Sequence, residues 1–211
     1  MVHIIPAILT SEKKELDQRM TALRGKVSWV QIDIMDGEFV PHTSIEIESV
    51  TLYRDAFSLE AHLMVNHPLQ YIERCKKSGV KRITFHSESL DDPRTVLQQI
   101  MMAGMETGIA LNPETTVADV ASVVPITNRV LLLGVHPGAQ GQTFIPDVLK
   151  KVRQIRDISS ETIVALDGGV NEATVAQIIV SGITEVVVGS ALFQKNDVGD
   201  ALKRLQGLTK E

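Results

Sequence analysis

The stretch TIVALDGGVNEATVAQIIVSGITEVVVGSALF, residues Thr162–Phe193, decides the fold. A short apolar, β-branched run at Thr162–Leu166 is followed by a helical pattern at Glu172–Ser181 and by a second β-branched run at Glu185–Val188. Runs of this kind predict strands, and the intervening amphipathic pattern predicts a helix. Two strands separated by a helix predict a parallel pair joined by a crossover connection.

The same alternation extends along the whole chain. Eight runs predict strands, at His3–Ile8, Ser28–Ile34, Leu59–Met64, Val80–Phe85, Thr107–Leu111, Val130–Val135, Thr162–Leu166 and Glu185–Val188. The helical patterns lie at Glu12–Leu23, Pro68–Ser78, Pro93–Ala103, Pro146–Ile158 and Glu172–Ser181. Eight such units without a linker or a change in composition predict a (β/α)₈ TIM barrel that forms a single domain over residues 1–211. An open doubly wound sheet is the alternative.

Composition excludes several classes of function. The net charge of −5 argues against nucleic acid as a partner, because a phosphate backbone selects basic surfaces. The single cysteine, Cys75, excludes an internal disulfide and favours a reducing compartment. The N-terminus lacks the pattern of a secretory signal, and no run approaches the roughly 18 apolar residues of a membrane span. We therefore expect a soluble, cytoplasmic protein that does not bind membranes.

Two acidic residues stand at the ends of predicted strands. The stretch WVQIDIMDGEFVP, Trp29–Pro41, places Gln31, Asp33 and Met35 on one face of a strand, and Asp167 ends the seventh strand. Functional residues of such barrels lie at the C-terminal ends of the strands, so the two carboxyl groups should face each other across the mouth. One could remove a proton beside a carbonyl while the other returns a proton to the opposite face, which inverts a carbon centre. Alternatively, Asp33 only caps its loop.

A histidine stands beside this pair. His62 ends the third predicted strand and, with Asp33 and Asp167, could form an N/O site for Zn²⁺, Mn²⁺ or Fe²⁺. Such an ion, or positioned donors, would stabilise the negative charge of an enediolate. The other histidines are interpreted as pocket-lining (His86, His136) or as hydrogen-bonded structural residues (His3, His42, His67).

Glycines follow the last strands, where barrels commonly bind phosphate. Glycines let a phosphate approach the backbone, and the N–H groups of a short helix hold the anion. Alternatively, these glycines serve turn geometry alone. The predicted phosphate-binding residues are Gly168, Gly169, Gly189 and Ser190, joined by Gly138 and Gly141 of a third loop. Met35 and Met64 are expected either to form an apolar surface beside the reacting carbons or to fill the core.

Eight short stretches carry a family resemblance. They are IIPAIL (Ile4–Leu9), IDIMDGEFVP (Ile32–Pro41), AHLMVNHP (Ala61–Pro68), TFHSE (Thr84–Glu88), IALNPETT (Ile109–Thr116), HPGAQGQTF (His136–Phe144), LDGGVNEAT (Leu166–Thr174) and VVGSALF (Val187–Phe193). Together they resemble the ribulose-phosphate 3-epimerase family over nearly the whole chain. The resemblance implies a ribulose-phosphate-binding barrel that epimerises a ketose phosphate at C3. It also implies that Asp33 and Asp167 are both the acid/base pair and metal ligands, that His62 is a third ligand, and that the glycine loops hold the phosphate.

Four positions depart from the family pattern. Gln31 stands where the family has a histidine ligand, and Ala7 where it has a substrate-contacting serine; Leu133 replaces a methionine, and His136 precedes the proline of the sixth loop. A glutamine oxygen is a poorer ligand than imidazole for zinc or iron. Gln31 is thus either a candidate fourth ligand or a group that hydrogen-bonds the substrate, and we expect the divalent metal to be held weakly or not at all.

Three functions follow from these observations. The first is an epimerase that inverts C3 of ribulose 5-phosphate, xylulose 5-phosphate or a related pentulose or hexulose phosphate. The second is a sugar-phosphate-binding homologue with weak or no catalysis, suggested by Gln31 and Ala7. A decarboxylase or aldolase ranks last, because no lysine ends a predicted strand. We expect a small phosphorylated sugar as the partner and a homo-oligomer as the assembly.

Overall fold

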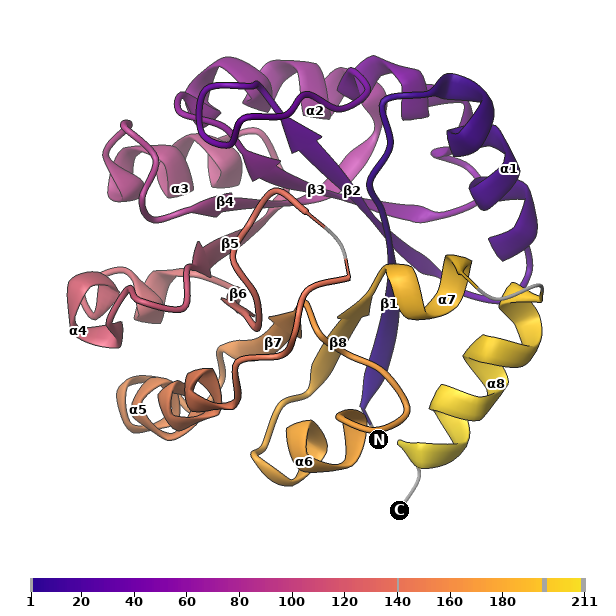
Figure 1. Cartoon of the computed structure of the whole chain (residues 1–211). Coiled ribbons are helices and arrows are strands. Elements are labelled where there is room, and N and C mark those ends of the chain that lie inside the picture. The colour runs from indigo at the N-terminus through magenta and orange to yellow at the C-terminus, as the bar shows by residue number, and fades with distance from the viewer. Residues whose placement is uncertain (1, 140, 195–196, 210–211) are drawn as a thin grey trace.

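Eight parallel strands close into a barrel in the order of the sequence (Figure 1). The computed structural model describes residues 2–139, 141–194 and 197–209. The strands are β1 (His3–Ile8), β2 (Trp29–Met35), β3 (Ser58–Met64), β4 (Val80–His86), β5 (Glu106–Leu111), β6 (Arg129–Leu133), β7 (Ile163–Asp167) and β8 (Glu185–Val188). The predicted (β/α)₈ fold is confirmed, and the open sheet is wrong because β1 pairs with β8.

Helices surround the strands (Figure 1). The α-helices are α1 (Lys13–Leu23), α2 (Ile72–Ser78), α3 (Pro93–Met102), α4 (Val117–Val120), α5 (Lys150–Ile158), α6 (Val175–Val180), α7 (Ser190–Phe193) and α8 (Val198–Leu208). The 3₁₀ segments are η1 (Ile47–Tyr53), η2 (Pro68–Tyr71), η3 (Val124–Ile126) and η4 (Pro146–Leu149). The main core lies between the barrel and these helices, as expected when parallel strands are covered on their outer face.

Several element boundaries differ from the sequence prediction. Pro68 and Pro146 each begin a 3₁₀ turn, and the α-helix follows only after that turn. The seventh connection enters its helix at Val175, later than predicted, because the Asn171 side chain accepts hydrogen bonds from the next backbone N–H groups and forms a turn. β6 ends before Gly134, whose N–H donates to the Asp167 carbonyl at 2.6 Å where the chain leaves the barrel.

Register brings the inward-facing residues of neighbouring strands to the same level. Asp33 pairs with His62, and His62 pairs with Thr84 on the next strand. Leu133 pairs with Asp167 on the other side of the barrel. The apolar part of the barrel interior consists of Ile5, Ala7, Ala110, Leu131, Leu133, Ala165 and Val187.

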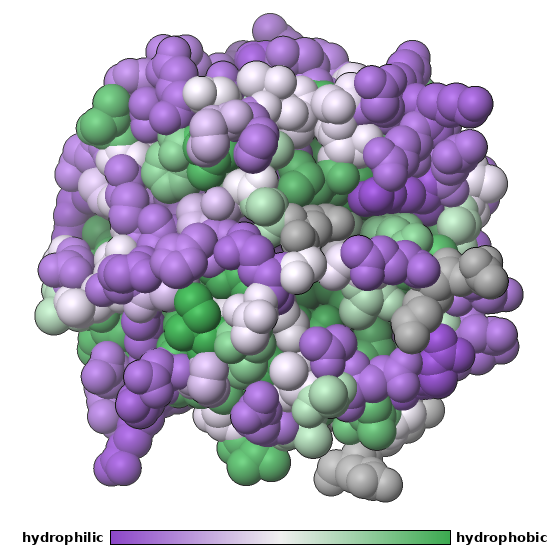
Figure 2. Space-filling model, viewed as in Figure 1, coloured by the Kyte–Doolittle hydropathy of each residue, from purple (hydrophilic) through white to green (hydrophobic). Residues whose placement is uncertain are grey.

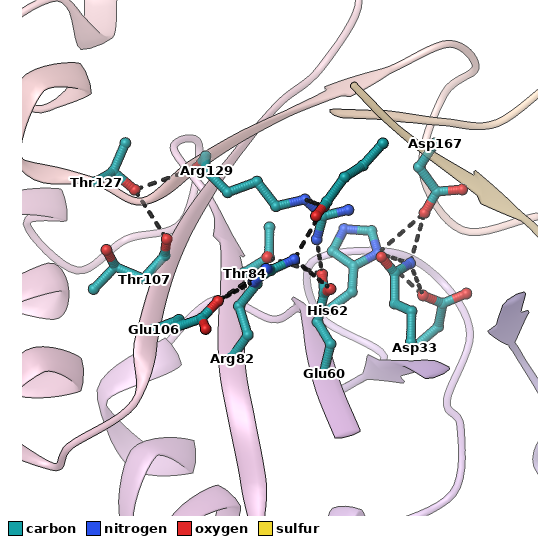
Figure 3. A network of polar contacts seen from close by, with 12 residues as sticks. Asp33, Glu60, His62, Arg82, Thr84, Glu106, Thr107, Thr127, Arg129 and Asp167 are labelled. Atoms are coloured by element: carbon teal, nitrogen blue, oxygen red, sulfur yellow. Dashed lines mark hydrogen bonds and ion pairs between the residues drawn. The ribbon is translucent and has the colours of Figure 1, made fainter. Parts of the chain in front are cut away.

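A layer of buried charges fills the barrel interior below this level (Figure 3). Arg129 and Glu60 are fully buried and form an ion pair. Arg82 lies 3.4 Å from Glu60 and 3.0 Å from Glu185, and Arg129 Nε lies 3.0 Å from the same Glu185 oxygen. Buried charges of this kind require partners. Two cations therefore alternate with two anions inside the barrel.

The face in Figure 2 has hydrophilic residues around its periphery and more hydrophobic and neutral residues around its centre. On the same face, the loop after β6 and helix α7 lie over the end of the barrel that is turned toward the viewer (Figure 1). Within residues 2–139, 141–194 and 197–209, no helix combines the length and the apolar character that a membrane span requires.

Candidate active site

A cavity opens at the C-terminal ends of the strands. Most of the predicted site residues line it: Asp33, His62, Met64, Gly138, Gly141, Asp167, Gly168, Gly169, Gly189 and Ser190. Ala7, Leu133 and His136, three of the positions that depart from the family pattern, line it as well. Among the described residues, no lysine lines this cavity. The barrel thus brings the two carboxyl groups and the three glycine-containing loops around one space.

Gln31 joins the two carboxyl groups that line the cavity. Its Nε2 donates to Asp33 Oδ1 at 2.9 Å and to Asp167 Oδ2 at 2.7 Å, and it lies 3.3 Å from His62 Nδ1. Asp33, His62 and Asp167 point toward one another from β2, β3 and β7 (Figure 3). The alternation of residues along β2 places Gln31 one level below Asp33 on the same inner face. The amide therefore holds the two carboxyl groups together.

Burial changes the acidity of both carboxyl groups. It raises the pKa of Asp33 to about 7, against the opposing effect of the Gln31 hydrogen bond. Burial, followed by the nearby Asp33 charge, raises the pKa of Asp167 to about 6. Like charges at close range disfavour the doubly ionised state. Near neutral pH, the pair can therefore hold one proton between its two carboxyl groups.

The same three side chains could hold a cation. One atom from each of Asp33, His62 and Asp167 lies within 4.8 Å of the others. His62 Nδ1 is 3.1 Å from Asp33 Oδ1 and 3.7 Å from Asp167 Oδ2. Two carboxylates and an imidazole suit a divalent transition metal. The buried Oε1 of Gln31 has no hydrogen-bond partner within the part of the chain that the structure describes.

The two glycines after Asp167 adopt a backbone conformation that favours glycine, and they also line the cavity. Gly168 has a φ of +96°, and a Cβ there would lie 2.5 Å from Val135 Cγ2. Gly169 has a φ of +73°, and a Cβ there would lie 2.6 Å from Phe144 Cβ. Only glycine adopts this backbone readily. Turn geometry and a phosphate site are thus compatible explanations, because both glycines also line the cavity.

The remaining candidates occupy different places. Met35 packs with Met64 and Val40 in a small apolar cluster, whereas Met64 also lines the cavity. His136 lies at the rim, with Nε2 2.7 Å from Glu114 Oε1. The other histidines are buried beside His62 (His86), bonded to Asp91 (His67) or exposed (His3, His42).

Sequence reasoning interpreted His86 as pocket-lining and assigned no role to Glu88, but His86 is fully buried behind His62 and is not among the described residues that line the cavity. His86 Nε2 lies 3.0 Å from His62 Nε2, and Glu88 Oε2 lies 3.3 Å from His86 Nδ1. The motif TFHSE contains both residues. The period of two along β4, which puts Arg82, Thr84 and His86 on the inner face, was the available signal.

The family comparison agrees with this geometry. Residues 3–193 match the model of the ribulose-phosphate 3 epimerase family. A ribulose-phosphate 3-epimerase from Mycobacterium tuberculosis (strain ATCC 25618 / H37Rv) is 34% identical over 210 residues, which cover 96% of this chain and 91% of the relative. The enzyme of that name from Bacillus subtilis (strain 168) is 32% identical, with 98% and 99% covered. The chain belongs to the ribulose-phosphate 3-epimerase family. It is thus a member of an enzyme family of isomerases, as its sequence predicted.

Solved structures of other proteins share the fold of this ribulose-phosphate 3-epimerase family member. KGPDC from Streptococcus mutans, in complex with a phosphorylated sugar, superposes with a TM-score of 0.80 at 13% identity, with 99% of this chain and 97% of the other covered. The 3-hexulose-6-phosphate synthase from Salmonella typhimurium gives 0.77 at 13% identity, with 99% and 98% covered. Similarity at this level of identity establishes the fold alone.

Proposed function

We propose that this protein epimerises C3 of ribulose 5-phosphate, xylulose 5-phosphate or a related ketose phosphate, with Asp33 and Asp167 as the acid/base pair. The observation that carries the proposal is a pair of carboxyl groups that line one cavity and are joined by Gln31, 2.9 and 2.7 Å from its Nε2. Membership of the ribulose-phosphate 3-epimerase family supports the choice of substrate.

Inversion requires one carboxylate and one carboxylic acid at the same time. The ionised group removes the C3 proton beside the C2 carbonyl, and the electron pair moves to the carbonyl oxygen to give a planar enediolate. The protonated group then delivers its proton to the opposite face of C3. Because the pKa values of Asp33 and Asp167 are both raised toward neutral pH, one of the two groups can be ionised while the other is protonated. In the reverse reaction the two groups exchange roles.

The glycine loops would hold the phosphate at the side of the cavity. Gly168, Gly169 and Gly189 offer backbone that a phosphate can approach, and Ser190 begins α7 with N–H groups that lack partners within the helix. Gly138 and Gly141, from the loop after β6, line the same space. The phosphorylated sugar bound to the Streptococcus mutans barrel supports the same class of ligand here. Met64 would pack against the carbon chain, with Met35 behind it.

A divalent cation is compatible with the donor set. Asp33, His62 and Asp167 would hold it, and Gln31 would contribute its amide oxygen, which lacks a partner within the described residues, once the amide turned to exchange Oε1 with the Nε2 that now faces the three ligand atoms. Such an ion would stabilise negative charge on the enediolate oxygens. Because an amide is a weaker ligand than imidazole, Gln31→His should increase zinc affinity, measured by calorimetry and by elemental analysis of the purified protein. Equal zinc affinity in both proteins would exclude Gln31 from the ligand set.

Proton exchange tests the reaction directly. In D₂O, the protein should replace the C3 proton of ribulose 5-phosphate by deuterium and produce xylulose 5-phosphate, both followed by NMR. Asp33→Asn and Asp167→Asn should each abolish interconversion, because each direction needs both groups. Residual exchange from one epimer only would show which face each residue serves. Asp147→Asn, which changes an exposed carboxylate, is the matched control.

The second candidate is a sugar-phosphate-binding homologue. Ala7 lines the cavity with no polar atom in its side chain, which favours this alternative. Absence of exchange with every pentulose and hexulose phosphate tried, with and without added divalent metal, would overturn the epimerase. Binding of the same sugars, measured by calorimetry, would then identify the homologue.

A further inference from the structure

The cavity offers few cationic groups to an anionic ligand. Within the part of the chain that the structure describes, no lysine and no arginine lines it, whereas the carboxyl groups of Asp33 and Asp167 do. A sugar phosphate would therefore bring a dianion toward two acidic groups, with backbone N–H groups as its donors. Two histidines line the same cavity, and one of them, His62, lies 3.1 Å from Asp33. His136 is the other basic side chain of the described lining.

His136 stands at the rim, between the loops that follow β5 and β6. Its Nε2 lies 2.7 Å from Glu114 Oε1, and 60% of its side chain is exposed. This hydrogen bond lowers the pKa of Glu114, so the partner is a carboxylate near neutral pH. A carboxylate can only accept, which means that Nε2 carries a proton and donates it. Nδ1 makes none of the hydrogen bonds found among the described residues and is the nitrogen left for a ligand.

The loop after β6 holds His136 beside two of the predicted phosphate-binding glycines. The Gln142 side chain donates from Nε2 to the carbonyl of His136 at 2.7 Å and to that of Ala139 at 2.9 Å. The loop therefore turns back on itself, which brings its two ends together around Gly138 and Gly141. All five residues line the cavity. The imidazole thus stands on the same loop wall as the glycines.

We propose that His136 binds the phosphate of the substrate through Nδ1 while its Nε2 donates to Glu114. The identity of this ligand rests on the proposed function, whereas affinity for an anion does not. A phosphate dianion accepts hydrogen bonds, so Nδ1 must carry a proton in the complex, and the ring is then an imidazolium between two anions. Because His136 is one of the positions that depart from the family pattern, this contact is an addition to that pattern.

The affinity for an anion should consequently depend on pH. A histidine gains or loses its second proton between about pH 5 and 8, so anion affinity should fall as pH rises through this range. Glu114 faces the ring, and Lys151 near it donates to backbone carbonyls and does not line the cavity. Asp33 and Asp167 also lose protons in this range. Only the difference between wild type and a His136 variant is therefore assigned to the imidazole.

Sulfate is a suitable probe, because it remains a dianion throughout this range. Measured by calorimetry, His136→Asn should bind sulfate about 10-fold more weakly than wild type at about pH 6 and within about twofold of it at about pH 8. His136→Arg carries a permanent charge, so its sulfate affinity should change less with pH than that of wild type. His3→Asn, at an exposed histidine that begins β1 at the opposite end of the barrel, is the matched control and should bind as wild type does.

Steady-state kinetics with ribulose 5-phosphate adds a second measurement. His136→Asn should raise KM about 10-fold at about pH 6 and leave kcat nearly unchanged, because the phosphate contact is the same in the bound substrate and in the transition state.

Equal sulfate affinities of wild type and His136→Asn at about pH 6, or no sulfate binding to wild type, would overturn the proposal. A raised KM with unchanged sulfate affinity would overturn it too, since the ring would then contact a sugar hydroxyl. Failure of the proposed function has a different signature, because sulfate binding would still depend on His136 in a protein that exchanges no substrate proton.

Discussion

Removal of Arg129 tests the buried charge layer of the barrel. Its guanidinium is fully buried, paired with Glu60 and 3.0 Å from Glu185. Arg129→Met retains much of the side-chain volume but removes the charge. The two glutamates would then compete, among the described residues, for the single guanidinium of Arg82, which also pairs with Glu106 at 2.8 Å.

The expected loss is large because the anions left behind are buried. Breaking a buried ion pair by removing one partner costs about 3–5 kcal/mol of unfolding free energy. Glu60→Gln should cost a similar amount, since it leaves Arg129 with half of its partners. The double variant restores the charge balance, so its loss should be smaller than the sum of the single losses by about 1–3 kcal/mol.

Urea unfolding measures these free energies. The single tryptophan, Trp29, lies beneath the guanidinium of Arg82 at 4.5 Å, so its fluorescence reports on this layer. Far-UV circular dichroism reports on the helices, and coincident transitions would justify a two-state treatment. Arg74→Met is the matched control, because Arg74 pairs with two glutamates on the surface and should contribute at most about 1 kcal/mol. A loss below about 1 kcal/mol for Arg129→Met, or strict additivity in the double variant, would refute the reasoning.

Three other predictions concern the pH dependence of stability and the glycines. Because the pKa of Asp33 rises from 3.8 unfolded to about 7 folded, the native state binds more protons between these values, and stability should fall as pH rises from about 4 to about 7. In EDTA at about pH 8, the unfolding free energy of Asp33→Asn should therefore exceed that of wild type by roughly 2–4 kcal/mol, and the difference should vanish near about pH 4. Equal urea midpoints of the two proteins at both pH values would contradict this. Gly108→Ala should lower stability by about 1–3 kcal/mol, because its Cβ would meet the Thr84 hydroxyl oxygen inside the barrel. Gly207 lies in α8 with open space where a Cβ would be added, so Gly207→Ala should raise stability by about 0.5–1 kcal/mol. Thermal melts that rank Gly108→Ala as more stable than Gly207→Ala would contradict both glycine predictions.

The sequence by itself determined the order and type of the elements. Eight β-branched runs separated by helical patterns predict parallel strands, because each crossover is too long for a hairpin, and the number eight favours a closed barrel over an open sheet. Once that fold is assumed, Asp33, His62 and Asp167 must stand at the C-terminal ends of β2, β3 and β7. The sequence predicted the element boundaries less well. The Asn171 side chain, for example, accepts hydrogen bonds from two backbone N–H groups, so the helix begins later than predicted.

Only the tertiary structure decided which side chains touch. Gln31 and Asp167 are 136 positions apart, and their 2.7 Å contact depends on how the closed barrel sets the height of each strand. The same holds for the contact of His62 with His86 and for the ion pair of Arg129 with Glu60. Periodicity along one strand shows that a residue faces inward, but the neighbour it meets there comes from the register of other strands. The alternation of residues in the sequence thus predicts which residues face inward, whereas the closure of the barrel determines which of them are in contact.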